Sequence, residues 1–219
     1  MSHHYSEGEV PSAEAYQAAL GDVVECLQHA RMRTLFIGGV SAATLSRPRP
    51  TDDIDLLVHP DDADPLLDRL EASGFETRRE DPSWLFKAFR HGVLVDLIFK
   101  STGDIYLDDE MWAHARIASF KGHRVRLVGP EDLLVIKAVA SAEHSPHHWF
   151  DALGLVARGD LDWDYLVSRA RRFGPRRVLA LLVYAESNDL AVPLEAVSRL
   201  DELVHPVAPR PSAIVGSGR

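Results

Sequence analysis

Two glycines and two carboxylates stand out in the first quarter of the chain. Gly38 and Gly39 close one apolar run, and Asp53 and Asp55 lie in a second apolar run after a short loop. Because side chains alternate between the two faces of a strand, the carboxylates should point the same way while Ile54 points into the core. Paired carboxylates on a rigid strand supply hard oxygen ligands for one or two divalent ions. Asp53 and Asp55 are therefore candidate metal ligands.

The glycines suit a phosphate-binding turn. Gly38 and Gly39 allow the backbone to approach an anion closely and to start a helix whose N–H groups face it, with Ser41 in the first turn. An enzyme that catalyses a polyphosphate transfer must bind the phosphate oxygens, place Mg²⁺ and orient the attacking hydroxyl. Arg47 and Arg49, in the loop that follows, are either further phosphate contacts or solvated charges.

The stretch 38–58, GGVSAATLSRPRPTDDIDLLV, resembles the nucleotidyltransferase superfamily with the DNA polymerase beta-like fold. The pattern of that superfamily is Gly-Gly or Gly-Ser, a short helix, a basic residue and Asp-x-Asp. The resemblance implies an α/β (α+β) domain with a mixed sheet. It also implies Mg²⁺-dependent transfer of a nucleoside monophosphate from an NTP to a hydroxyl, with one or two ions bound.

A third carboxylate, Asp96, interrupts the apolar run 93–99 and should share a face with Leu94 and Ile98. An unpaired carboxylate is costly to bury there, and a metal or a cation would reduce the cost. The resemblance implies a third acid on a strand beside Asp-x-Asp, acting as metal ligand or as base, and Asp96 is the matching position. The alternative is a structural ion pair with Lys87 or Arg90.

Lys137 lies in a predicted helix that opens at Pro130, beside Leu133, Leu134 and Ala140. A lysine on an apolar face needs an anion, and a triphosphate would serve. The alternative is that its side chain extends along the surface to reach water.

The second half resembles bacterial nucleotidyltransferases of the abortive-infection and toxin type. The matching positions are Glu131-Asp132-Leu133 with Lys137, followed by Asp151 on the next helix, whereas His147 and His148 replace a usual Lys and Asp. This resemblance implies nucleotide contacts for Lys137 and Asp151, an RNA acceptor such as the end of a tRNA, and an antitoxin partner. Resemblance of DDIDL and GHRVRLV to antibiotic-modifying enzymes implies an aminoglycoside-like acceptor instead. A catalytically silent nucleotide-binding scaffold is the third possibility.

A basic run in the last third of the chain bears on the RNA acceptor. It contains no acid and is formed by Arg169, Arg171, Arg172, Arg176 and Arg177. Guanidinium groups suit phosphate, although such a run is also typical of a solvated helix face. The net charge of −9 argues against a broadly basic nucleic-acid binder without excluding a local patch.

The remaining polar residues carry less information. His144, His147 and His148 lack a fourth ligand at zinc spacing, so solvated histidines are favoured over a metal site. Cys26 is the only cysteine, which excludes an internal disulfide, and its surroundings predict packing within a helix. No apolar run approaches a membrane span and no signal-peptide pattern is present, so a cytoplasmic protein is expected.

The 219 residues are expected to form two parts. A flexible N-terminus covers 1–11, a nucleotidyltransferase α/β domain covers 12–128, a helical domain covers 129–204, and a Pro- and Ser-rich disordered tail covers 205–219. The helical domain should close a cleft over the carboxylates, where a ligand is expected.

Overall fold

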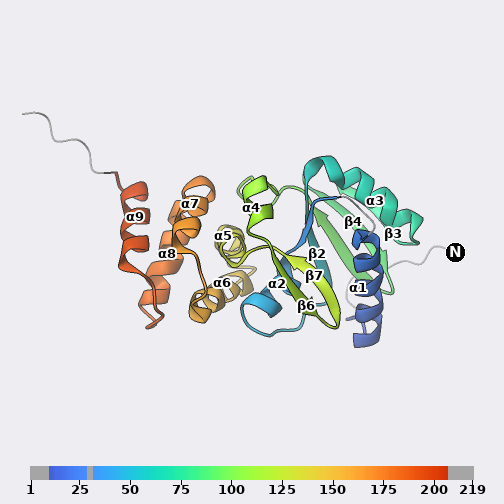
Figure 1. The fold of residues 1–219 in the computed structure, drawn as a ribbon, viewed down its shortest axis with the longest axis horizontal. Helices are drawn as coiled ribbons and strands as arrows, with labels where there is room; N and C mark the ends of the chain where they lie inside the picture. Colours follow the sequence, from blue (N-terminus) through green and yellow to red (C-terminus); the bar gives the residue numbers. More distant parts are fainter. Residues whose placement is uncertain (1–9, 29–31, 207–219) are drawn as a thin grey trace, which may run out of the picture.

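The computed structural model describes residues 10–28 and 32–206, and it contains a mixed sheet of seven strands flanked by helices (Figure 1). The strand order is β3-β4-β5-β2-β1-β7-β6. The strands are β1 (Thr34–Phe36), β2 (Asp53–Val58), β3 (Glu76–Asp81), β4 (Leu85–Arg90), β5 (Val93–Ile98), β6 (Arg116–Phe120) and β7 (His123–Leu127). This arrangement confirms the α/β class with a mixed sheet.

The centre of the sheet joins strands that are far apart in the sequence. β2 pairs with β5 in parallel and with β1 in antiparallel fashion, and β1 pairs with β7 in parallel. The β2–β5 register places Asp55 opposite Asp96. Pairing of two segments separated by a helix and a hairpin therefore brings the predicted acids together.

One face of the sheet is covered by α1 (Ala13–Gln28) and α3 (Ala63–Ala72), with the short helix η1 (Pro60–Asp62) before α3 (Figure 1). Ile54, from the centre of Asp-x-Asp, is fully buried in this core together with Leu20 and Leu66. Cys26 is buried in α1, as its surroundings predicted. Burial of Ile54 on this face leaves its two acidic neighbours on the opposite face.

The second core lies between the other face of the sheet and the helices that follow it. Leu35 and Leu57 of the sheet pack in one cluster with residues of the later helices, such as Leu134 and Leu181. These helices extend away from the sheet (Figure 1). They are α4 (Asp109–Ala113), α5 (Pro130–Ala140), α6 (His147–Arg158), α7 (Trp163–Phe173), α8 (Pro175–Glu186) and α9 (Leu194–Val204). The hydrophobic core thus continues across position 128, and the division into two domains there stays a prediction.

Local sequence signals explain most of the element boundaries. The Ser12 hydroxyl accepts a hydrogen bond from the Ala15 amide at the start of α1, as an N-cap does. His91 and Gly92 both adopt positive φ in the tight turn that joins β4 and β5. The helix α2 (Gly38–Leu45) begins at Gly38, directly after β1 and Ile37.

The terminal predictions fall largely outside the described residues. Of the flexible segment expected for 1–11, the structure describes only residues 10 and 11. Of the tail expected for 205–219, it describes only residues 205 and 206. Within the described ranges, no helix is long and apolar enough to cross a membrane.

Candidate active site

Three carboxylates share one face of the sheet. Asp53 and Asp55 on β2 are half-buried while Ile54 between them is fully buried, so both acids point away from the α1–α3 core. Asp96 on β5 is also half-buried and lies directly beside Asp55 in the parallel register. Strand alternation therefore acts as expected on both strands, and the structure brings together the three acids predicted as metal ligands.

Burial and mutual repulsion make the three carboxylates hard to ionise together. Burial is the largest cause that raises the pKa of Asp55, and the charges of Asp53 and Asp96 raise it further. Burial raises the pKa of Asp96 to about 6, although Lys87 on β4 opposes the shift. Like charges held close in a partly desolvated site favour protonation or a bound cation.

The donor set fits a divalent cation. The Oδ1 atom of Asp96 is buried and has no hydrogen-bond partner, a costly state that a bound cation would relieve. Carboxylate oxygens are the ligands that Mg²⁺ prefers. Among the described residues, no three His, Cys, Asp or Glu side chains converge closely enough to form a ready-made metal cage. The three carboxylates therefore have the right ligand chemistry for a divalent cation, but their side chains do not converge on one position in this structure.

The alternative ion pair for Asp96 does not form in the described part of the chain. Lys87 lies opposite Asp96 in the β4–β5 register but makes no salt bridge with it, and Arg90 pairs with Asp22. Among the described residues, Asp96 thus has no salt-bridge partner.

The glycine turn holds the Asp55 carboxylate at the start of α2. Gly38 has a φ of 52°, a conformation that favours glycine, and a Cβ there would overlap the Asp55 carboxylate. A hydrogen bond from the Gly39 amide to Asp55 opposes the rise of its pKa. The two motifs of the sequence therefore meet in one place.

Gly39→Ala is expected to lower stability by about 1–3 kcal/mol and to reduce nucleotidyl transfer more than tenfold. A Cβ at Gly39 would overlap the hydroxyl of Thr51, which donates a 2.9 Å hydrogen bond to Asp53 Oδ1. Thermal unfolding and initial rates of transfer measure both effects. Gly21→Ala is the matched control, because its added methyl meets only the His123 ring at 3.2 Å in a regular helix. Equal behaviour of the two variants would contradict a tightly packed turn.

Ser41 does not face the phosphate-binding turn. Its side chain is fully buried, and its hydroxyl donates a 2.7 Å hydrogen bond to the Phe36 carbonyl. The phosphate contact expected for Ser41 therefore has no support in the geometry, because the only hydroxyl proton is used within the chain.

Lys137 is buried. The alternative that its side chain extends along the surface to reach water is therefore wrong. Its side chain is 3% exposed, and Nζ lies 3.2 Å from Asp151 Oδ2 on α6. Asp151 is fully buried and also accepts hydrogen bonds of 3.1 Å from Nε and Nη2 of Arg49. Arg47 lies 3.6 Å from the same carboxylate. The anion that Lys137 needs is thus supplied by the chain itself.

This cluster joins the loop before β2 to the helical half. Burial would raise the pKa of Asp151, but hydrogen bonds from Arg49 and the charge of Lys137 outweigh it, so the pKa is lowered. Burial lowers the pKa of Lys137, and Asp151 opposes this shift. Three cations around one carboxylate leave an excess of positive charge, which suits a neighbouring polyphosphate. Asp151 therefore orients the cations and has no free oxygen to offer a nucleotide.

The histidines at the start of α6 form no metal group with other residues in the described ranges. Burial lowers the pKa of His148 to about 4, and the nearby Lys137 charge lowers it further, so the imidazole is neutral near pH 7. Its Nδ1 lies 3.2 Å from Lys137 Nζ. His148 is therefore a neighbour of Lys137 and not a solvated residue as expected.

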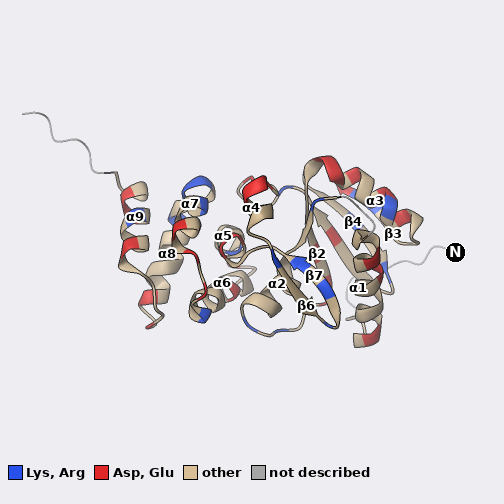
Figure 2. Ribbon diagram, in the orientation of Figure 1, with Lys and Arg blue, Asp and Glu red and all other residues tan. Residues whose placement is uncertain are grey.

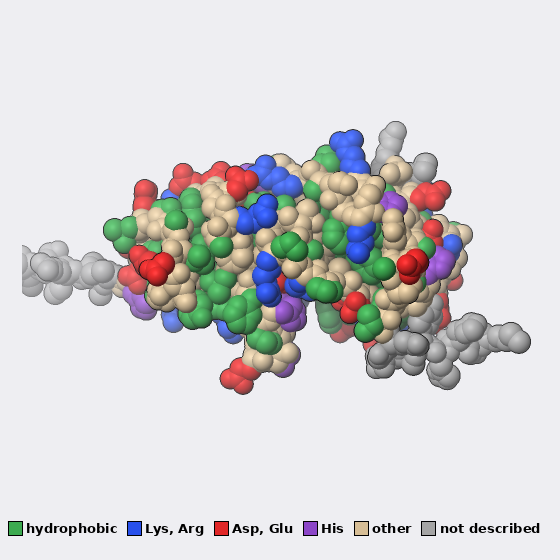
Figure 3. Space-filling model, turned by 90° about the horizontal axis from the view of Figure 1, so that it is seen from below, with side chains coloured by type: hydrophobic (Ala, Val, Ile, Leu, Met, Phe, Trp, Pro, Cys, Tyr) green, Lys and Arg blue, Asp and Glu red, His purple; other side chains and the backbone are tan. Residues whose placement is uncertain are grey.

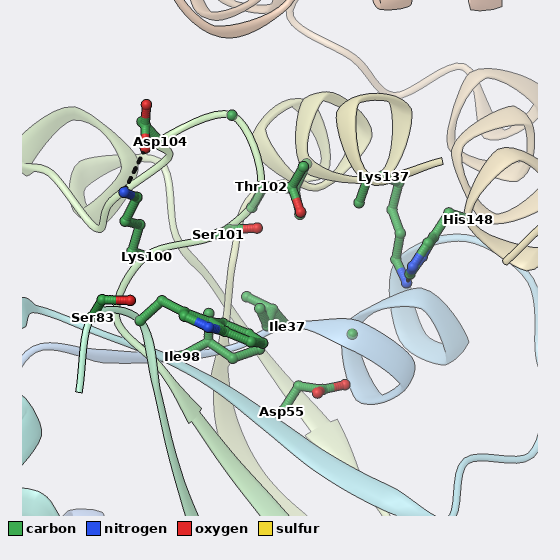
Figure 4. A pocket seen from close by; sticks show the side chains of 15 residues that line it. Ile37, Asp55, Ser83, Ile98, Lys100, Ser101, Thr102, Asp104, Lys137 and His148 are labelled. Carbon is green, nitrogen blue, oxygen red and sulfur yellow. Dashed lines mark hydrogen bonds and ion pairs between the residues drawn. The ribbon is translucent and has the colours of Figure 1, made fainter. Parts of the chain in front are cut away.

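A cavity of about 440 Å³ lies between the sheet and α5 (Figure 4). Asp55 and Gly38 border the cavity on the sheet side, and Lys137 and His148 border it on the helical side. In Figure 4 the side chains of Lys137 and His148 point toward each other. Of the three carboxylates, Asp55 lines the cavity directly. A cavity is thus present at Asp55, lined by residues from both parts of the chain.

The basic run of the last third does not form one surface. Arg169 is fully buried and binds Asp132 at 2.6 Å and Asp108 at 2.7 Å. Arg172 pairs with Asp108 as well. Figure 2 shows the basic end of α7 beside the acidic α4, and the cations on the face in Figure 3 occur as separate spots. The described residues of this run therefore form no continuous basic face, although Arg171, Arg176 and Arg177 are exposed.

Sequence reasoning missed the far end of the cavity. Trp84 and the segment 100–104 line it together with the predicted residues. Trp84 lies in the turn between β3 and β4, and a single tryptophan beside a strand gives no signal that separates a surface residue from a ligand contact. Its significance depends on the sheet order, which the sequence does not reveal.

Comparisons with known proteins agree with the geometry. Residues 7–186 match the family described as uncharacterised nucleotidyltransferase. The solution structure of the antibiotic-resistance factor ANT(2'')-Ia is similar, with a TM-score of 0.52, 17% identity and coverage of 81% of this chain and 95% of that chain. A crystal structure of an antigenic nucleotidyltransferase-like protein from Paracoccidioides brasiliensis has a TM-score of 0.51 and 17% identity, covering 87% of this chain and 94% of that chain. No curated protein sequence matches the chain.

The fold and the family match define a nucleotidyltransferase. Because the match spans most of the chain, the protein belongs to the family described as uncharacterised nucleotidyltransferase. The enzyme class expected from 38–58 is thereby confirmed. The narrower likeness to toxin-type enzymes is not confirmed by these comparisons.

Proposed function

We propose that this protein transfers a nucleoside monophosphate from an NTP to a hydroxyl group of an acceptor and releases pyrophosphate. The observation that carries the proposal is the placement of Asp53, Asp55 and Asp96 on one sheet face beside a cavity bordered by Lys137. Mg²⁺ held by these carboxylates would neutralise phosphate oxygens. The α2 amides and Lys137 would hold the pyrophosphate portion.

The chemical step needs one base. The acceptor oxygen attacks the α-phosphorus, the bond from that phosphorus to the pyrophosphate oxygen breaks, and pyrophosphate leaves with the bond electrons. The proton of the acceptor hydroxyl passes to a carboxylate. Asp96 is the candidate for this role, because it lies beside Asp55 in the β2–β5 register and its Oδ1 has no competing hydrogen bond.

We favour a small-molecule acceptor. The similar structure ANT(2'')-Ia is an antibiotic-resistance factor. A cavity of about 440 Å³ has the size typical of a small-ligand site. The acids on the sheet would also attract a cationic acceptor.

A tRNA acceptor, with an antitoxin partner in the cytoplasm, is the second candidate. The observation in its favour is the group of exposed arginines on α7 and α8, which guanidinium–phosphate pairing would use. Burial of Arg169 removes the centre of that basic run and reduces the support for this candidate.

Label transfer tests the proposal. The protein is incubated with each α-³²P-labelled NTP and Mg²⁺, with an aminoglycoside panel including tobramycin in one set and total tRNA in another. Mg²⁺-dependent label on a panel compound, lost on addition of EDTA, is the expected result. Label on tRNA alone would replace the small-molecule acceptor with the second candidate. Label on neither, with NTP still bound, would favour a catalytically silent scaffold.

A further inference from the structure

We propose that Trp84 forms the acceptor subsite and stacks against a ring of the acceptor. This inference rests on the proposed function and deepens it by assigning one end of the cavity to the acceptor. Trp84 lies in the turn between β3 and β4, remains 39% exposed, and lines the same cavity as Asp55 and Lys137. Large exposed aromatic side chains inside a cavity are typical of ligand contacts.

The indole is held in place although it is exposed. Its Nε1 donates a 3.0 Å hydrogen bond to Asp81 Oδ2, and its backbone carbonyl accepts a 3.0 Å hydrogen bond from the Phe99 amide. Asp81 is fixed in turn by hydrogen bonds of 2.9 Å and 2.6 Å from the amide and hydroxyl of Ser83. An aromatic ring fixed before the ligand arrives loses little conformational entropy on binding.

The sheet order separates the two ends of the site. α2 begins at Gly38, directly after β1, on one side of β2. Trp84 precedes β4, on the other side of β2 and beyond β5, which carries Asp96. The Asp55 carboxylate, at the floor of the cavity, therefore lies between the glycine turn and the indole.

The geometry of phosphoryl transfer then assigns each end. The attacking and leaving oxygens lie roughly in line on opposite sides of the phosphorus. If the glycine turn and Lys137 hold the leaving pyrophosphate, the acceptor must approach from the side of Asp96 and Trp84. The candidate base and the indole thus lie on the same side of the reacting phosphorus.

The lining at this end indicates the class of acceptor. Ser101 and Thr102 line the cavity on the side of Lys100 (Figure 4). Lys100 itself is paired with Asp104 at 2.8 Å, so its charge is neutralised within the segment. An indole face beside hydroxyl groups suits a ring that has one apolar face and polar substituents at its edge, as a sugar or cyclitol has. The inferred acceptor is a ring-bearing polyol, with or without amino groups.

Kinetics of Trp84→Ala and Trp84→Phe test the inference. The acceptor is the compound that the wild-type protein labels in the transfer experiment, and the nucleotide probe is an NTP with a methylene bridge between its α and β phosphorus atoms. Trp84→Ala is expected to raise the acceptor KM by about 10–100-fold, the usual effect of losing one stacked ring. The Kd of Trp84→Ala for the nucleotide probe with Mg²⁺ should stay within about twofold of the wild-type value. Trp84→Phe should have an acceptor KM close to that of the wild-type protein.

Tyr184→Ala is the matched control. Tyr184 is exposed to a similar extent, at 44%, but lies on α8 outside the residues that line this cavity. A larger change in nucleotide Kd than in acceptor KM for Trp84→Ala would overturn the inference and assign the indole to the nucleobase. An unchanged acceptor KM would also overturn it while leaving the proposed function intact. Absence of transfer to any acceptor by the wild-type protein would overturn the proposed function and this inference together.

Discussion

Replacement of Asp55 by asparagine is expected to abolish nucleotidyl transfer while raising the thermal stability of the metal-free protein. Asparagine has the same shape and can still accept the hydrogen bond from Gly39, but it cannot supply a carboxylate to a cation. Loss of several kcal/mol of charge stabilisation corresponds to a decrease in kcat/KM of at least about 10³-fold. Initial rates at saturating NTP and Mg²⁺ measure this effect.

The gain in stability follows from the raised pKa of Asp55. Burial, followed by the charges of Asp53 and Asp96, raises that pKa from 3.8 to about 7. As pH rises from about 4 to 7, the unfolded chain loses this proton before the folded chain does, so the wild-type protein loses stability across that interval. Asparagine does not titrate. The variant should therefore be more stable by about 1–3 kcal/mol at pH 8, and the difference should disappear near pH 4.

Thermal unfolding at pH 8 and near pH 4, without divalent cations, measures the difference. Addition of Mg²⁺ should raise the Tm of the wild-type protein but not that of Asp55→Asn, because a ligand stabilises only a folded state that binds it. Asp52→Asn is the matched control, since Asp52 is the exposed neighbour of the pair. Full activity in Asp55→Asn, or equal Mg²⁺ responses in both proteins, would contradict the metal assignment.

Arg169→Met is expected to destabilise the protein by about 3–5 kcal/mol, because it leaves a buried carboxylate without its cation. Arg169 is fully buried, and it binds Asp132, Asp108 and Glu110 at 2.6, 2.7 and 3.2 Å. The Tyr165 hydroxyl donates a 2.6 Å hydrogen bond to the same Asp132. This network connects α5 and α7 to the segment at the start of α4.

The measurement is thermal unfolding, in which a decrease of roughly 10 °C is expected for a chain of this size. Arg171→Met is the matched control, because Arg171 is exposed on the same helix and surface substitutions usually change stability by less than about 0.5 kcal/mol. If RNA binding were the role of Arg169, the variant would keep its Tm and lose only affinity for tRNA. That result would contradict a structural role.

Much of the catalytic region was determined by the sequence itself. Strand alternation requires only local geometry, so the shared orientation of Asp53 and Asp55 and the burial of Ile54 follow from their spacing. The conformation of Gly38 and the hairpin turn at His91-Gly92 are equally local. The superfamily pattern in 38–58 then identified the fold, because a turn and an acid pair in that order are together more informative than either alone.

Tertiary structure alone decided which charges pair and what borders the cavity. Arg49 binds Asp151, and Arg169 binds Asp108, although the two residues of each pair are far apart in the sequence. No local sequence pattern indicates these contacts, so the sequence could not show that the two arginines are paired with acids. Burial of Ser41 likewise depends on packing against β1. Trp84 lines the same cavity as Asp55 only because β4 and β2 lie on either side of β5. Side-chain periodicity specifies the face of each element, whereas ion pairs and cavities depend on how distant elements pack, which a single sequence does not encode locally.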